Sequence, residues 1–212
     1  MAFGSLKGAA SKTTGAPSGL QTRHSTGFEQ FCAVLQRVEA QSVLDMSGVS
    51  QANISFITGL GHRISSDDII GTMEDCFGKD FIAGQQAAVN AQRFLDQSLT
   101  FPDASFDSAL IWDAFQFLTG HLLDQAIAQL LRVMRPGGLM LLFFNADEKA
   151  TRLPVYNYRI QDQKTLVQVP RGGLTQTAQY FPNRTIEKLF ERATSLKFFL
   201  TRDSLREVIV RR

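Results

Sequence analysis

The feature of the sequence that most constrains the fold is an unbroken apolar run from Leu139 to Phe144, which directly follows a Pro-Gly-Gly turn at residues 136–138. A strand with one exposed face alternates apolar and polar residues, so this run indicates a strand that is buried on both faces. Strands of this kind occupy the centre of parallel sheets covered by helices. The run therefore predicts an α/β domain built around a mainly parallel sheet.

Strand-like and helix-like segments alternate along most of the chain. Predicted strands lie at residues 42–48, 62–68, 108–113 and 139–144. Apolar residues at helical spacing predict helices within residues 26–38, 52–60, 85–95, 123–134 and 183–190. Arg93 to Asp96 is an alternative short strand. The last third changes character, because residues 156–160 and 165–169 form a predicted hairpin and residues 196–200 and 207–211 two final strands. This strand-rich end predicts an antiparallel edge.

The 212 residues are enough for one domain with a sizeable core. Residues 1–25 are rich in Gly, Ser, Ala, Thr and Lys, so we expect a disordered basic arm there. Order is expected to begin at Thr26, which forms a helix-capping pattern with Glu29. The predicted organisation is therefore an N-terminal arm, 1–25, and a single domain, 26–212.

Charge and composition limit the classes of partner and the location that can be expected for this chain. Residues 151–212 contain twelve basic and five acidic side chains. Because these charges are spread among predicted strands and a helix, a solvated face is favoured over a nucleic-acid surface. No apolar run could cross a membrane and no secretory signal is visible, so a cytoplasmic location is expected. The spacing of Cys32 and Cys76 indicates neither a disulfide framework nor a zinc site.

Four segments, taken in order, resemble the motifs of class I S-adenosylmethionine-dependent methyltransferases. They are VLDMSGVSQ (43–51), SSDD (65–68), FPDASFDSALIWDAFQFL (101–118) and LLRVMRPGGLMLLFF (130–144). The resemblance implies a Rossmann-like three-layer sandwich, with a mainly parallel seven-stranded sheet and an antiparallel C-terminal edge. It also implies S-adenosylmethionine as the cofactor, bound across the carboxyl ends of the parallel strands.

The resemblance assigns roles to acidic residues at strand ends. Asp45 would support the methionine end of the cofactor, and Asp67 or Asp68 would bond its ribose hydroxyls. Asp96 would approach the adenine amine if it ended a third strand.

The glycine loop after the first strand departs from the family pattern. Ser47, Val49 and Gln51 stand where the family has glycines, and Gly48 is out of register. A β-branched Val49 suits no left-handed conformation, and Gln51 lies where the loop approaches the ligand. Two hypotheses remain open. Either a reshaped loop binds the cofactor, with Ser47, Gly48 and Ser50 offering amides and hydroxyls, or side chains fill the pocket.

Asp113, directly after the predicted fourth strand, is the candidate catalytic residue because its position faces an acceptor. Trp112 and Phe115 are its neighbours, and Tyr156 and Tyr158 could form walls of the pocket. The alternative is that Trp112 and the tyrosines are packing residues and that Asp113 caps a turn.

The predicted function is methyl transfer from S-adenosylmethionine to a small-molecule acceptor. An amino-adenine methylase is disfavoured because no Asn/Asp-Pro-Pro-aromatic tetrapeptide follows the fourth strand, and a cytosine C5 methylase because no cysteine follows a proline. The alternative is a non-catalytic binding or scaffold module that has lost the cofactor. A nicotinamide-dependent dehydrogenase is a poorer hypothesis because its Gly-x-Gly-x-x-Gly fingerprint is absent from the first turn. The sequence assigns no oligomeric state.

Overall fold

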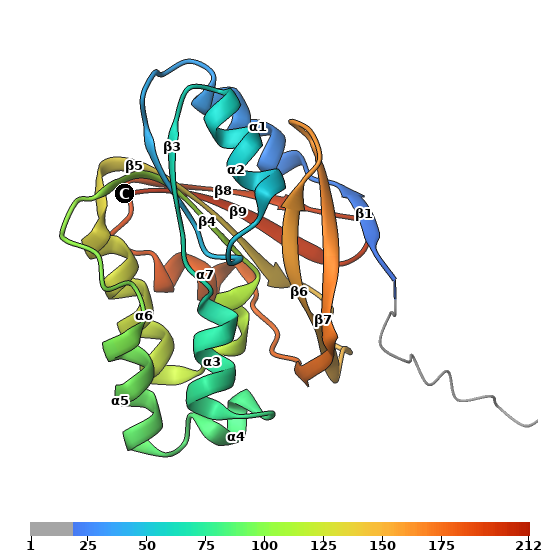
Figure 1. Ribbon diagram of the computed structural model, residues 1–212. Coiled ribbons are helices and arrows are strands. Elements are labelled where there is room, and N and C mark those ends of the chain that lie inside the picture. The colour runs from blue at the N-terminus through green and yellow to red at the C-terminus, as the bar shows by residue number, and fades with distance from the viewer. Residues whose placement is uncertain (1–18) are drawn as a thin grey trace, which may run out of the picture.

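A six-stranded sheet forms the centre of the protein in the computed structural model, which describes residues 19–212 (Figure 1). Its strands, in spatial order, are β3 (Arg63–Ser66), β2 (Ser42–Asp45), β4 (Phe106–Trp112), β5 (Met134–Asn145), β9 (Leu205–Arg211) and β8 (Ser195–Leu200). The first four pair in parallel, and β9 and β8 are antiparallel. The expected parallel sheet with an antiparallel C-terminal edge is therefore confirmed.

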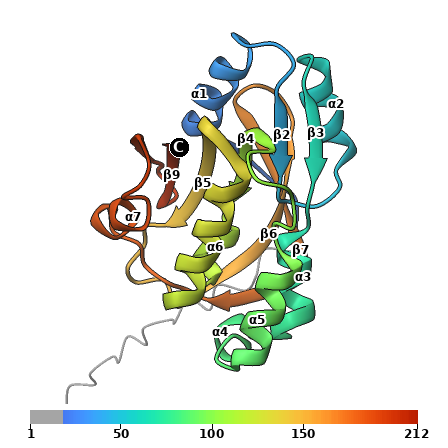
Figure 2. The same ribbon diagram turned by 90° about the vertical axis from the view of Figure 1, so that its left-hand side faces the viewer.

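Helices cover both faces of this sheet, which confirms the three-layer Rossmann-like arrangement (Figures 1 and 2). One face packs against α1 (Thr26–Leu35) and α2 (Gln51–Gly59). The other packs against α3 (Ile69–Phe77), α4 (Phe81–Gly84), α5 (Ala88–Gln97), α6 (Gly120–Val133) and α7 (Asn183–Leu189). Leu141 and Phe143 of β5 face the first layer, and Leu142 and Phe144 face the second. Both faces of β5 are thus buried, which explains its unbroken apolar run.

The main sheet has six strands among residues 19–212, one fewer than the seven that were expected. The alternative strand at Arg93 to Asp96 is wrong, because these residues lie inside α5. Phe94 packs at 5.2 Å, ring centre to ring centre, on Phe77 of α3. Apolar side chains at helical spacing are buried between helices here, where a short edge strand would leave them exposed. No helix in this part of the chain has the length and hydropathy needed to span a membrane.

A second, three-stranded antiparallel sheet stands at the carboxyl end of β4 (Figure 1). It consists of β1 (Gln21–His24), β7 (Thr165–Thr177) and β6 (Arg152–Ile160), in that spatial order. The predicted hairpin forms β6 and β7 and is longer than expected. A 3-10 helix, η1 (Ala114–Phe117), follows β4 at the same edge of the main sheet.

The ordered domain begins earlier than the sequence indicates. Residues 1–18 lie outside the described residues, but Gln21–His24 pair with β7, so the arm expected over residues 1–25 does not extend to 25. Arg23 forms an ion pair with the fully buried Glu207 of β9 at 3.1 Å. Ser25, rather than Thr26, caps α1, and its hydroxyl accepts a hydrogen bond from the Phe28 amide. Residues 21–25 are all polar, so neither contact leaves a hydrophobic periodicity that could be read from the sequence.

These contacts predict different effects for two truncations. Removing residues 1–24 should lower the free energy of unfolding by about 3 kcal/mol relative to removing residues 1–18, because Glu207 would lose its buried partner. Urea denaturation of the two truncated proteins measures this difference, and equal stabilities would show that β1 does not support the domain.

Candidate functional site

Asp45, the last residue of β2, is the centre of a buried hydrogen-bond network. Its Oδ1 accepts bonds from the Ser47 amide (3.1 Å), the Ser47 hydroxyl (2.9 Å) and the Trp112 indole Nε1 (2.7 Å). Its Oδ2 accepts one from Asn53 Nδ2 at 2.6 Å. Burial raises the pKa of Asp45, and these hydrogen bonds counteract the increase. The carboxylate therefore joins the ends of β2 and β4 to the start of α2.

The loop after β2 turns its large side chains outward. Gly48 takes the left-handed conformation (φ +81°), so Val49 does not have to. The Val49 side chain is 84% exposed, Gln51 is exposed at the start of α2, and the Ser50 hydroxyl caps that helix. Of the two hypotheses for this loop, the structure agrees with a changed loop shape and not with a pocket filled by Val49 or Gln51.

The loops after β2 and β3 lie directly against each other. The Gly48 amide donates to the carbonyl oxygen of Asp67 at 2.9 Å, and Ser47 forms an isolated antiparallel bridge with Asp68. The Asp67 amide in turn donates to the carbonyl oxygen of Asp45 at 2.8 Å. The structure thus brings together the predicted site residues of both strands.

The three remaining acids differ in their surroundings. Asp67 is half-buried; burial raises its pKa, and a hydrogen bond from the Leu99 backbone opposes that effect. Asp68 is exposed and caps α3, where its carboxylate accepts a bond from the Gly71 amide. Asp96 is an exposed residue of α5 and accepts a hydrogen bond from Gln92. Because it lies within a helix, Asp96 does not end a third strand, as its expected role at the adenine required.

Trp112, the last residue of β4, is stacked beneath Tyr158 of β6. Their rings are parallel to within 2°, with centres 5.0 Å apart. Trp112 has φ +58°, a conformation that costs a bulky residue about 1 to 3 kcal/mol and persists only where its surroundings impose it. The stack on one side and the hydrogen bond to Asp45 on the other supply that constraint. Trp112 is thus both a core residue and part of the site.

A polar cavity of about 210 Å³ lies between η1, the end of β5 and the second sheet. Its lining includes Arg23, Asp113, Gln116, Asn145, Tyr156, Tyr158 and Gln168. The Tyr158 hydroxyl donates to Asp113 Oδ2 at 3.0 Å and accepts a bond from Gln168 Nε2 at 3.2 Å. The structure therefore places Asp113 beside both predicted pocket tyrosines.

Asp113 is almost completely buried, with 3% of its surface exposed. This burial raises its pKa to about 7, although the Tyr158 hydroxyl and the charge of Arg23 act in the opposite direction. A carboxyl group with a pKa near neutrality can exchange a proton with a ligand at physiological pH. Shifted acids in cavities are characteristic of functional sites.

Two residues of the network were not identified from the sequence. Asn53 bridges Asp45 and the hairpin, because its amide donates to Asp45 while its Oδ1 accepts a bond from the Ile160 amide at 2.7 Å. The sequence did contain a signal for Asn53, because it lies four residues before Ile57 and therefore on the same, buried face of α2. Arg171 of β7 binds Asp68 with two hydrogen bonds, at 2.8 and 2.9 Å. No local pattern connects residues so far apart in the chain.

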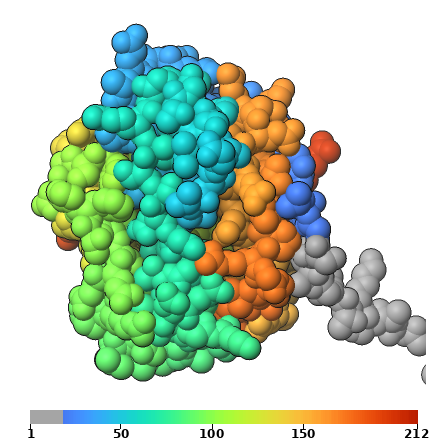
Figure 3. All heavy atoms as spheres, in the orientation of Figure 1, coloured from blue at the N-terminus to red at the C-terminus, as the bar shows by residue number. Residues whose placement is uncertain are grey.

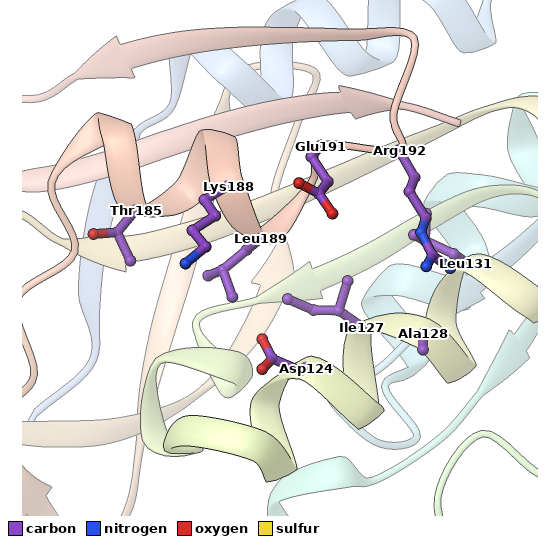
Figure 4. Close-up of a pocket in the computed structure, with 9 residues that line it drawn as sticks. All are labelled: Asp124, Ile127, Ala128, Leu131, Thr185, Lys188, Leu189, Glu191 and Arg192. Carbon is purple, nitrogen blue, oxygen red and sulfur yellow. The ribbon is translucent and has the colours of Figure 1, made fainter.

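A larger cavity of about 480 Å³ lies elsewhere, between α6 and α7 (Figure 4). Ile127, Leu131 and Leu189 contribute apolar surface, while Asp124, Lys188 and Arg192 supply charge. None of the residues predicted for cofactor binding or catalysis lines it. The smaller cavity beside Asp113 is therefore the better candidate for chemistry.

The sequence profile of the methyltransferase domain family matches residues 48–142, which run from the loop after β2 to the middle of β5. No protein of curated function matches the sequence.

Several solved structures are similar in fold. A Pyrococcus horikoshii protein aligns with a TM-score of 0.51 at 17% identity, over 87% of this chain and 88% of its own. A Methanosarcina mazei S-adenosylmethionine-dependent methyltransferase aligns at 0.49 and 15% identity, over 82% and 93%. A Burkholderia thailandensis 1,6-didemethyltoxoflavin N1-methyltransferase, solved with its acceptor and S-adenosylhomocysteine, aligns at 0.48 and 13% identity, over 88% and 78%. At 17% identity the likeness to the Pyrococcus horikoshii protein shows the fold alone.

The raised pKa of Asp113 predicts a pH-dependent stability. Between its ordinary value of 3.8 and about 7 the folded protein retains a proton that the unfolded chain has released, so rising pH destabilises the fold. Relative to Asp113→Asn, the wild type should lose about 1.4 kcal/mol of unfolding free energy per pH unit in this window. Urea denaturation at several pH values measures it, and a constant difference between the two proteins would contradict the assignment.

Proposed function

We propose that this chain, which matches the methyltransferase domain profile over residues 48–142, binds S-adenosylmethionine along the carboxyl ends of β2 and β4 and methylates a small acceptor. The observation that supports the acceptor site is the buried Asp113, in a polar cavity next to the acids at the strand ends. The bound cofactor would supply an electrophilic methyl group.

The chemistry of the strand-end residues suits this cofactor. Asp45 offers a carboxylate to the methionine ammonium, and Asp67 offers one to ribose hydroxyls. The left-handed Gly48 allows the backbone to approach a ligand closely. In the described arrangement, however, both oxygens of Asp45 already accept hydrogen bonds from the chain. A cofactor ammonium at Asp45 would have to displace one of these bonds, and two of the donors, Ser47 and Asn53, are also bonded to the backbone of the hairpin.

The cavity beside Asp113 favours a small, polar acceptor. Its 210 Å³ lies below the range of about 300 to 1,000 Å³ that is usual for drug-sized ligands. Gln116, Asn145 and Gln168 contribute side-chain amides to its wall. An acceptor hydroxyl or amine would hydrogen-bond to Asp113, whose pKa of about 7 allows its carboxylate to take the proton released on methylation. While the hairpin is closed, the Tyr158 hydroxyl holds Asp113 in place.

A non-catalytic scaffold is the second candidate, because the same hydrogen bonds that satisfy Asp45 would stabilise the fold without any ligand. Calorimetric titration with S-adenosylmethionine separates the two candidates. Binding supports the proposed function, whereas a folded protein that takes up no cofactor under any condition supports the scaffold.

Asp67 provides a direct test of the cofactor site. Asp67→Ala should weaken S-adenosylmethionine binding by about 1 to 3 kcal/mol, since it removes a charged hydrogen-bond acceptor from the ribose. Asp124→Ala, which removes an exposed acid on α6, is the matched control and should bind as the wild type does. Calorimetry measures both affinities. Unchanged binding by Asp67→Ala would exclude this residue as the ribose anchor.

A further inference from the structure

The β6–β7 hairpin lies across the carboxyl ends of β2 and β4, where the proposed cofactor would bind. The carbonyl oxygen of Tyr158 accepts hydrogen bonds from Asn53 Nδ2 (3.0 Å) and the Ser47 hydroxyl (3.2 Å). The Ile160 amide donates to Asn53 Oδ1 at 2.7 Å. The backbone of β6 is thus joined to the same side chains that hold Asp45.

The side chain of Tyr158 covers the end of β4. Its ring stacks on Trp112, and its hydroxyl donates to Asp113. Tyr158 is 1% exposed and Trp112 2% exposed, so the hairpin packs directly on the end of β4 at this point. Figure 3 shows the surface of the hairpin, in orange, directly adjoining the blue-green surface of α2 and α3.

Arg171 of β7 fastens the hairpin to the end of β3. Its two terminal nitrogens bind the two oxygens of Asp68, and its Nε binds Glu74 of α3 at 2.6 Å. We call Arg171, Asp68 and Glu74 the clamp. The side chains of Asp68 and Glu74 are 44% and 36% exposed, so solvent competes for these ion pairs and the clamp can open at little cost.

Next to the clamp, β7 contains a point at which the strand can bend. Gly172 and Gly173 both have positive φ, +58° and +75°, and a side chain added at either would meet no atom within 4 Å. The pairing of β6 with β7 changes register here, between Pro154 and Tyr156. Two glycines at a register change leave the backbone free to alter its direction without a steric barrier.

We infer that the β6–β7 hairpin is a self-inhibitory strap, which bends at Gly172–Gly173 and competes with the cofactor for the ends of β2 and β4. Closed, it supplies the hydrogen bonds and the stacked ring that a bound nucleoside would otherwise make. Opening breaks the clamp and separates Tyr158 from Trp112. It also releases Asn53 from the backbone of β6, so that Asn53 can turn away from Asp45 and leave that carboxylate accessible. The apparent affinity for cofactor is then reduced in proportion to the open fraction. This inference rests on the proposed function.

The test uses the full chain with S-adenosylhomocysteine as the probe. Arg171→Gln removes the clamp, and Glu74→Gln weakens it without touching an acid expected to bind cofactor. Arg159→Gln is the matched control, since this exposed arginine lies on the same hairpin and its guanidinium has no partner within residues 19–212. Calorimetry gives the affinity. Trp112 is the only tryptophan of the chain, so acrylamide quenching of its fluorescence reports independently whether Tyr158 still covers it.

If the strap competes with cofactor, Arg171→Gln should bind the probe about tenfold more tightly than the wild type, Glu74→Gln should lie between them and Arg159→Gln should match the wild type. Without the probe, acrylamide should quench Trp112 more strongly in Arg171→Gln than in the wild type, because Tyr158 covers the indole for a smaller fraction of the time. Equal affinities in all four proteins, with Trp112 quenched equally in the wild type and in Arg171→Gln, would overturn the strap and leave the proposed function intact.

The proposed function fails in a different way. If Arg171→Gln exposes Trp112 but binds no probe, the clamp holds the hairpin and yet no cofactor site lies beneath it, so competition with the cofactor is overturned as well. If Arg171→Gln neither exposes Trp112 nor binds the probe, the clamp itself is overturned.

Discussion

The rest of the site depends on how the carboxylate of Asp45 is satisfied. A buried carboxylate without donors is strongly destabilising, and here four hydrogen bonds from Ser47, Asn53 and Trp112 compensate its burial. Each donor has a second consequence. Ser47 and Asn53 also bind the backbone of β6, and the bond from Trp112 helps to hold that residue in its left-handed conformation. Asp45 thereby links β2, the loop that follows it and the hairpin.

This arrangement explains how the domain tolerates a loop without the glycines of the methyltransferase motif that it resembles. A glycine-rich loop leaves space for a ligand close to the backbone, whereas here the space beneath Tyr158 is filled by the chain itself. The substitutions at Val49 and Gln51 are not what fills it, because both side chains are exposed. The element that governs access is the hairpin, which follows β5 and is more than a hundred residues from the loop that it covers.

The hairpin is attached to the rest of the domain by two kinds of contact, apolar packing and ion pairs. Tyr156, Tyr158 and Ile160 join the buried cluster on the α1–α2 face, which gives the closed state its stability. Arg171 adds ion pairs that solvent can exchange. Competition between a ligand and such a closed state depends on the difference in free energy between open and closed forms, not on the affinity of an open cleft alone.

The sequence by itself determined the parallel sheet, its antiparallel edge and the positions of Asp45, Asp67 and Asp113 at or directly after strand ends. These follow from local patterns, because burial of both faces of β5 leaves a continuous apolar run and turns leave glycine and proline. It also placed Asp113 beside two tyrosines, although it could not decide between packing and chemistry. Tertiary structure alone decided the ordered β1 strand, the role of Arg171 and the closure of the site. Each of these depends on contacts between segments distant in the chain, and pairings of that kind leave no periodicity in the sequence to read.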